Sequence, residues 1–137
     1  MNLAITRIKK IIPHFNEKPL DESDFWRIVR REKITVVETD LFINGFYFEC
    51  EKGAFIYLNS GLRGICWLEN AFHELAHHFL HTPPGDERDE AEARTIALMA
   101  LLPLSELEKA AVEADDFSEV AGRILHERLQ VFAEYGF

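Results

Sequence analysis

A short segment near the middle of the chain carries the residues best suited to chemistry. His73 and His77 are four positions apart, so on a helix they lie on one face and can direct their imidazole nitrogens at one metal ion. Glu74 projects about 100° away from His73, near such an ion without binding it. Zinc held by three protein ligands keeps an open position for water and lowers the pKa of that water to about 7. A neighbouring carboxylate can then accept the proton as general base and pass it to a leaving amine.

The sequence after the histidine pair limits where a third ligand can come from. A histidine six residues beyond His77, which would complete an extended three-histidine motif, is absent because Pro83 stands there. His81 continues the histidine face by one turn, but three ligands stacked along one helix diverge too far to share a tetrahedral ion. We expect His81 to be a polar neighbour. The third ligand is therefore predicted to be a carboxylate from the following helix, among Asp86, Glu87, Asp89, Glu90 and Glu92.

Glu90 is the preferred candidate for this third ligand. It lies on the same helical stripe as the small residues Ala93, Ala97 and Ala100, which would let its helix approach the histidine helix closely. Glu92 belongs instead with the apolar positions at 96 and 99 and is kept as the alternative. Either glutamate, taken alone, is also what the positive end of a helix dipole favours in a first turn.

Hydrophobic periodicity predicts the elements that must hold these residues. Helical spacing is found over residues 2–12, 22–31, 65–81, 87–102, 105–114 and 118–135. Ser105, followed by Glu108 three residues later, is predicted to form a capping box, and Ser118 is predicted to cap the last helix. Three runs rich in β-branched and aromatic residues, separated by turn signals at 44–45 and 51–53, are predicted to be the strands 34–37, 46–48 and 55–58.

The predicted fold class is α+β, with a small, mostly antiparallel three-stranded sheet, connected as a meander, packed against helices. The length of 137 residues indicates one domain over residues 1–137. Within it we expect N-terminal helices (1–31), the sheet with the metal-site helices (33–103), and C-terminal helices (104–137).

Composition narrows the function classes. The net charge of −9 and the absence of a Lys/Arg-rich run argue against direct nucleic-acid binding. No signal peptide is recognisable at the N-terminus, and no apolar run approaches the roughly 20 residues that span a bilayer. Cys50 and Cys66 each lie in an apolar stretch and are predicted to be buried thiols rather than a disulfide or a metal pair. We therefore expect a reduced, cytoplasmic protein without membrane contact.

Several segments together resemble the ImmA/IrrE-type metallopeptidases, over roughly residues 33–137. The histidine motif alone is moderately specific, whereas its combination with the acidic segment and the Leu-Leu-Pro that follows is strongly so. The matching segments are Ile56-Tyr57-Leu58-Asn59, residues 72–81, Glu90-Ala91-Glu92-Ala93, Ala97, Leu101-Leu102-Pro103, Arg128-Leu129 and Tyr135-Gly136.

The resemblance implies a zincin-like core of the thermolysin type. It implies that His73, His77 and Glu90 are ligands of Zn²⁺ and that Glu74 is the catalytic base, although manganese or iron could use the same ligands. The family usually has Asn or Asp four residues after the ligand carboxylate, where it supports a metal ligand. This chain has Arg94 there, placed to form an ion pair with Glu90 instead.

The resemblance also implies a substrate. Such enzymes commonly cleave a helix-turn-helix repressor encoded beside them, which releases phage, mobile-element or stress genes. The alternative is a partner of a repressor or toxin–antitoxin-type module that binds without cleaving. Tyr57 and His126 are candidates for stabilising the tetrahedral oxyanion. The strand 55–58 is either an edge to which an extended substrate adds or a strand of the core.

Overall fold

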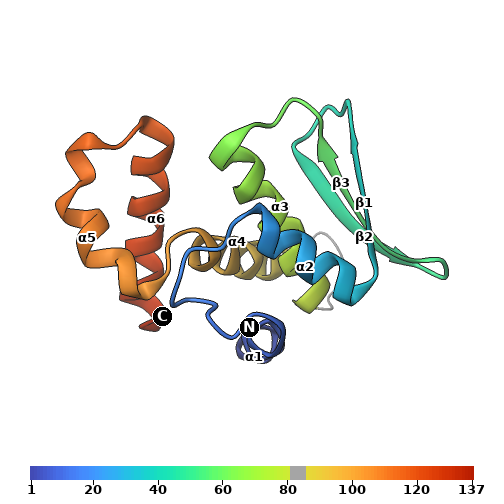
Figure 1. Ribbon diagram of the computed structural model, residues 1–137, viewed down its shortest axis with the longest axis horizontal. Coiled ribbons are helices and arrows are strands. Elements are labelled where there is room, and N and C mark those ends of the chain that lie inside the picture. Colours follow the sequence, from blue (N-terminus) through green and yellow to red (C-terminus); the bar gives the residue numbers. More distant parts are fainter. Residues whose placement is uncertain (81–85) are drawn as a thin grey trace.

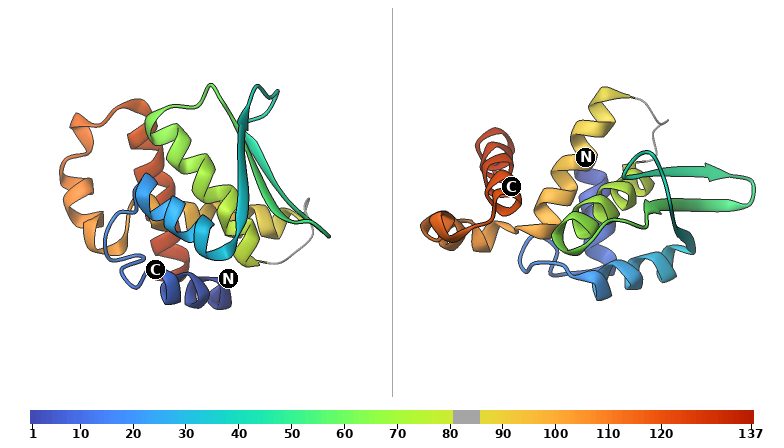
Figure 2. Two further views of the ribbon diagram at one scale, coloured as in Figure 1. Left: turned by 45° about the vertical axis from the view of Figure 1, so that its right-hand side comes forward. Right: turned by 90° about the horizontal axis from the view of Figure 1, so that it is seen from above.

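A computed structural model describes residues 1–80 and 86–137, and it has the predicted α+β fold (Figure 1). The elements in chain order are α1 (Asn2–Ile11), α2 (Glu22–Glu32), β1 (Ile34–Thr39), β2 (Gly45–Cys50), β3 (Gly53–Asn59), α3 (Gly64–Leu80), α4 (Glu87–Leu101), the 3-10 turn η1 (Leu104–Glu106), α5 (Leu107–Val112), the 3-10 turn η2 (Ala114–Asp116) and α6 (Glu119–Tyr135). Figures 1 and 2 show the sheet at one end, α5 and α6 at the other, and α3 and α4 between them. None of the described helices is long and apolar enough to cross a membrane.

The three strands lie where the sequence predicts them, but their order is β1-β3-β2 and the predicted meander is wrong. β3 is central: it pairs in parallel with β1 and antiparallel with β2, so the sheet is mixed rather than mostly antiparallel. Residues 40–44 carry the chain across the end of β3 to its far side. The side-chain amide of Asn59 holds this crossing by donating to the carbonyls of Leu41 (3.0 Å) and Ile43 (3.2 Å).

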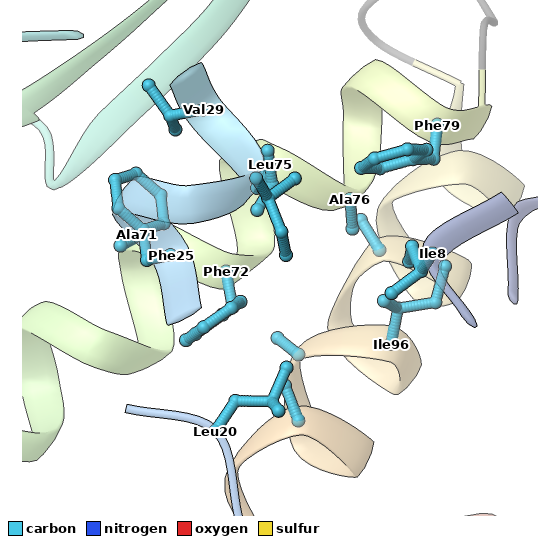
Figure 3. Close-up of a cluster of buried hydrophobic side chains, with 14 of the residues drawn as sticks. Ile8, Leu20, Phe25, Val29, Ala71, Phe72, Leu75, Ala76, Phe79 and Ile96 are labelled. Atoms are coloured by element: carbon cyan, nitrogen blue, oxygen red, sulfur yellow. The ribbon is translucent and has the colours of Figure 1, made fainter. Parts of the chain in front are cut away.

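The core lies between the inner face of the sheet and the helices. Ile56 and Leu58 of β3 are fully buried, whereas their neighbour Tyr57 faces the other side of the pleat. Figure 3 shows apolar side chains of α2, α3 and α4 meeting with those of α1; the labelled residues are Ile8, Leu20, Phe25, Val29, Ala71, Phe72, Leu75, Ala76, Phe79 and Ile96.

Helix α4 packs directly against α3, as its small residues predict. Ala93, Ala97 and Ala100 are each at most 1% exposed, so no long side chain separates the two helices on this side. This close approach is what brings the acidic start of α4 beside the histidines of α3.

Of the two predicted helix caps, the one at Ser118 is present and the one at Ser105 is not. Asp21 forms a capping box with Asp24 at the start of α2, and the Ser118 hydroxyl accepts the Ala121 N–H at the start of α6. The Ser105 capping box is wrong: α5 begins at Leu107 without a side-chain cap, and the Ser105 hydroxyl donates instead to the Glu17 carbonyl. The Ser105 hydroxyl thus hydrogen-bonds a backbone carbonyl far away in the sequence and does not cap the helix that follows it.

Arg128 fastens the C-terminal helices to the rest of the chain. Its side chain is completely buried; its Nε donates to the Leu102 carbonyl (2.6 Å) and one terminal nitrogen donates to the Asn16 side chain (3.1 Å). The same Asn16 oxygen accepts the Leu104 N–H. Burial lowers the pKa of Arg128 to about 10, which still leaves it charged at neutral pH.

The two cysteines form no disulfide, as predicted, but the prediction that both are buried is wrong. Cys50 ends the edge strand β2 and is exposed, and Cys66 is partly exposed in the first turns of α3. Apolar neighbours in sequence do not bury a residue that lies at the end of an edge strand.

Candidate metal centre

Helix α3 presents the two histidines and the glutamate on adjoining faces. The ring centroids of His73 and His77 are 5.1 Å apart, and candidate ligand atoms of His73, Glu74 and His77 all lie within 4.8 Å of one another. His77 and Glu74 are 8% and 7% exposed, whereas His73 is less deeply buried. The three residues therefore form one compact group on the helix, as their spacing in the sequence predicts.

Helix α4 brings Glu90 to both histidines. One carboxylate oxygen of Glu90 is 3.0 Å from Nε2 of His73 and the other is 3.0 Å from Nε2 of His77. The Glu90 side chain remains 49% exposed, so it reaches the histidines from the open side of the site. One carboxylate therefore contacts both histidines.

The arrangement fits a zinc ion. Ligand atoms in a tetrahedral zinc site are about 2.0–2.1 Å from the metal, which places them roughly 3.3 Å from one another. The separations of 3.0 Å between the Glu90 carboxylate and each histidine are close to that value. Two imidazoles and one carboxylate leave a fourth position open for water.

The other acidic residues considered as third ligand make different contacts. Glu92 faces the N-terminus of the chain, 3.6 Å from the Met1 amino group and 3.4 Å from Arg88. Asp86 caps α4 by accepting the Arg88 N–H at 3.0 Å. Asp89 is buried, and this burial together with the charge of Asp86 raises the pKa of its carboxyl. Of the two glutamates weighed as third ligand, the fold brings Glu90 to the histidines.

Burial shifts the pKa values of Glu74 and His73 in opposite directions. Burial, reinforced by the nearby charge of Glu90, raises the pKa of Glu74 to about 8. Burial also lowers the pKa of His73, and the neighbouring His77 and Arg94 act in the same direction while Glu90 opposes them. His73 is therefore held neutral at pH 7, the form in which an imidazole binds a metal.

The group opens into a cavity of about 430 Å³ between the edge strand and three helices. α6 supplies a wall that the sequence does not predict. Arg123 of α6 contacts Glu69 of α3 at 2.7 and 2.9 Å and lies 3.3 Å from Glu127. The lining residues are Asn44, Gly45, Glu69, Asn70, His73, Glu74, Glu90, Arg94, Ala97, Arg123 and Glu127.

Gly45 lets β2 come close to the site. A Cβ atom at this position would lie 2.7 Å from the Tyr57 carbonyl oxygen and 3.4 Å from Cγ of Glu74. In the sequence Asn44-Gly45 is only a turn signal, whereas in the structure Gly45 is the first residue of β2. The glycine is needed for this close approach, and nothing in the local sequence pattern indicates that.

Two predicted site residues are not brought to the cavity. Tyr57 alternates with the buried Ile56 and Leu58, so its ring stacks on Phe46 on the outer face of the sheet, 4.8 Å between centroids. His126 is exposed on α6, one residue before Glu127, which does line the cavity. His81, the expected polar neighbour, lies outside the described residues.

Arg94 does not form the expected ion pair with Glu90. The Glu90 carboxylate is turned to the two histidines, and within the described part of the chain Arg94 has no carboxylate within 4.0 Å. Its side chain is exposed at the cavity wall.

The strand beside the metal group is β2, not β3. β3 is paired on both sides, which excludes it as an edge for a further strand. Within residues 1–80 and 86–137, β2 pairs on one side only, with β3, and its first residue lines the cavity.

Two histidines and a buried glutamate on one helix, with a carboxylate from the next, meet the requirements of a metallopeptidase-like protein. Sequence comparison agrees: the peptidase M78 family, described as the IrrE N-terminal-like domain, matches residues 29–135, and the chain belongs to this family. No curated protein matches the chain.

Proposed function

We propose that this protein is a zinc-dependent endopeptidase in which His73, His77 and Glu90 hold the metal and Glu74 is the general base. The observation that carries the proposal is the position of the Glu90 carboxylate, 3.0 Å from each histidine Nε2 atom and beside the buried Glu74. A structural metal site would instead be closed by a fourth protein ligand.

In this proposal the metal and Glu74 have separate roles in hydrolysis. The metal, when bound, supplies a Lewis acid that polarises the scissile carbonyl and acidifies a water molecule. Glu74 accepts the proton of the attacking water and donates it to the amide nitrogen as the peptide bond breaks. Its pKa of about 8 in the metal-free protein suits the donating step, and a nearby cation favours the ionised form needed for the accepting step.

The free edge of β2 supports the binding of an extended peptide. Backbone groups at an unpaired strand edge hydrogen-bond an added strand, which gives affinity without demanding a particular sequence. A peptide added along β2 passes Asn44 and Gly45 and so reaches the cavity that holds Glu74.

The substrate in this proposal is a helix-turn-helix repressor encoded beside the gene, as the family resemblance implies. The alternative is a protein that binds such a repressor without cutting it. The buried Glu74 favours the enzyme, because burying an ionisable carboxylate destabilises the fold and pure binding has no chemical use for it.

Metal analysis and a cleavage assay test the proposal together. We expect about one zinc per chain, lost in His77→Ala, and a single defined cut in the repressor, absent in Glu74→Gln. The matched control is Glu92→Gln on α4, which should keep both metal and activity. Zinc binding without any cut in the native protein would support the non-cleaving alternative, and a protein that binds no metal would refute both.

A further inference from the structure

The cavity holds two arginines in different electrostatic situations. Arg123 is held by Glu69 at 2.7 and 2.9 Å and by Glu127 at 3.3 Å, so its charge is compensated by α3 and α6. Arg94 has no such partner: within the described residues no carboxylate lies within 4.0 Å of it. The cavity therefore has one uncompensated positive charge on its wall.

The position of Arg94 along α4 relates this charge to the metal group. Arg94 follows Glu90 by four residues and precedes Ala97 by three, and all three line the same cavity. They form a row that starts at the histidines and runs along α4. The charge of Arg94 lowers the pKa of His73, which agrees with the short distance between the two residues.

The space beside Arg94 suits a side chain. The cavity volume of about 430 Å³ is more than ten times the roughly 30 Å³ that one water occupies in the liquid, and the small residue Ala97 lines it together with Arg94. The cavity's other carboxylates do not oppose an incoming anion equally. Glu69 and Glu127 both contact Arg123, which offsets one of their two negative charges, and Glu90 faces the histidines.

We propose that Arg94 forms an acid-selecting subsite, which takes an aspartate or glutamate side chain of the substrate next to the scissile bond. The guanidinium binds a carboxylate through two parallel N–H donors, a geometry that a lysine cannot reproduce. The inference rests on the proposed metallopeptidase function and adds a substrate preference to it. Arg94 is a specificity residue here, with no part in the proton transfers.

Metal-binding hydroxamates test the subsite without knowledge of the natural substrate. Three blocked peptidyl hydroxamates that differ only in the residue next to the hydroxamate, Glu, Gln or Lys, are titrated into the zinc-loaded protein by calorimetry. The native protein should bind the Glu compound about 3- to 10-fold more tightly than the Gln compound, since a pair in a partly closed cavity exceeds the usual surface pair. Arg94→Gln should remove this preference, and Arg94→Glu should reverse it in favour of the Lys compound.

The control is Arg88→Gln, on the same helix but outside the cavity, where the side chain is 84% exposed and lies beside Glu92. It should leave the preference for Glu unchanged. Circular dichroism of each variant checks that the fold is kept, which is expected because Arg94 is exposed.

The outcomes separate this inference from the proposed function. Equal binding of the three compounds by the native protein would overturn the acid-selecting subsite and leave the metal centre standing. An equal loss of affinity for all three in Arg94→Gln would also overturn it, because it would mean that Arg94 acts on the metal group. Acid preference in a protein that cuts no peptide would retain the subsite and refute the endopeptidase. A failure of all three to bind the zinc-loaded protein would refute an open metal position facing this cavity, and the subsite with it.

Discussion

Replacing Glu74 by glutamine should stabilise the metal-free protein, and only at neutral to alkaline pH. The pKa of Glu74 is about 8 in the fold against an ordinary value of 4.5, because the side chain is buried next to Glu90. An acid with a raised pKa binds its proton more tightly in the folded chain than in the unfolded chain. Stability is therefore lost as the pH rises from about 4.5 to about 8.

The magnitude follows from the two pKa values. Their difference of about 3.5 corresponds to about 5 kcal/mol at 1.36 kcal/mol per pKa unit, which is an upper limit. Water entry and local rearrangement around an ionised Glu74 reduce the penalty, so we expect a gain of about 3 kcal/mol for Glu74→Gln at pH 8. For a chain of 137 residues this raises Tm by about 10 °C.

The assay is thermal unfolding of both proteins in a chelating buffer at pH 5 and pH 8. At pH 5 the native Glu74 is protonated in the fold, so the two Tm values should nearly coincide. Glu92→Gln serves as the control, because it removes a carboxylate paired with the Met1 amino group and Arg88 and should give no gain at pH 8. A Tm difference that is the same at both pH values would refute the argument from burial.

Four further substitutions test the metal site and the architecture that supports it. Glu90→Gln should weaken zinc binding by at least about 100-fold in a chelator competition, whereas Glu92→Gln should change it less than about 3-fold. Gly45→Val should lower the free energy of unfolding by about 2 kcal/mol in urea and reduce cleavage more than tenfold, because its Cβ meets the Tyr57 carbonyl oxygen at 2.7 Å. Gly122→Ala, with open space around its Cβ, should instead stabilise α6 by about 0.5–1 kcal/mol. Arg128→Ala should destabilise by about 3 kcal/mol, since it leaves the Leu102 carbonyl unpaired; unchanged urea midpoints would contradict these assignments.

Local patterns in the sequence predict most of the fold correctly. The α+β class, the positions of the strands and the helices around the site all follow from hydrophobic periodicity and turn residues. The approach of α4 to α3 also follows from the sequence, because Ala93, Ala97 and Ala100 repeat at helical spacing. These features depend on residues that are close in sequence, within one or two helical turns, and hydrophobic periodicity can be recognised over that range.

The order of the strands depends on longer-range contacts. Three short strands joined by short connections predict a meander, and the actual order β1-β3-β2 requires the segment 40–44 to cross the end of β3. The Asn59 side chain, eighteen residues from Leu41, satisfies that crossing. Since a single sequence does not reveal which distant carbonyls an asparagine will bond, it leaves open whether the strand 55–58 is an edge or a core strand, and the structure makes β3 central and β2 the edge beside the site.

The chemistry of the centre is determined by the sequence, and its surroundings are decided by the tertiary structure. The spacing of His73, Glu74 and His77 places them together on any helix, because 3.6 residues make one turn. The choice of Glu90 over Glu92 depends on which face α4 turns to α3, for which its alanines supply only a guide. The raised pKa of Glu74 and the cavity wall formed by α6 arise only in the fold, because burial and contacts between residues far apart in sequence do not exist in the extended chain.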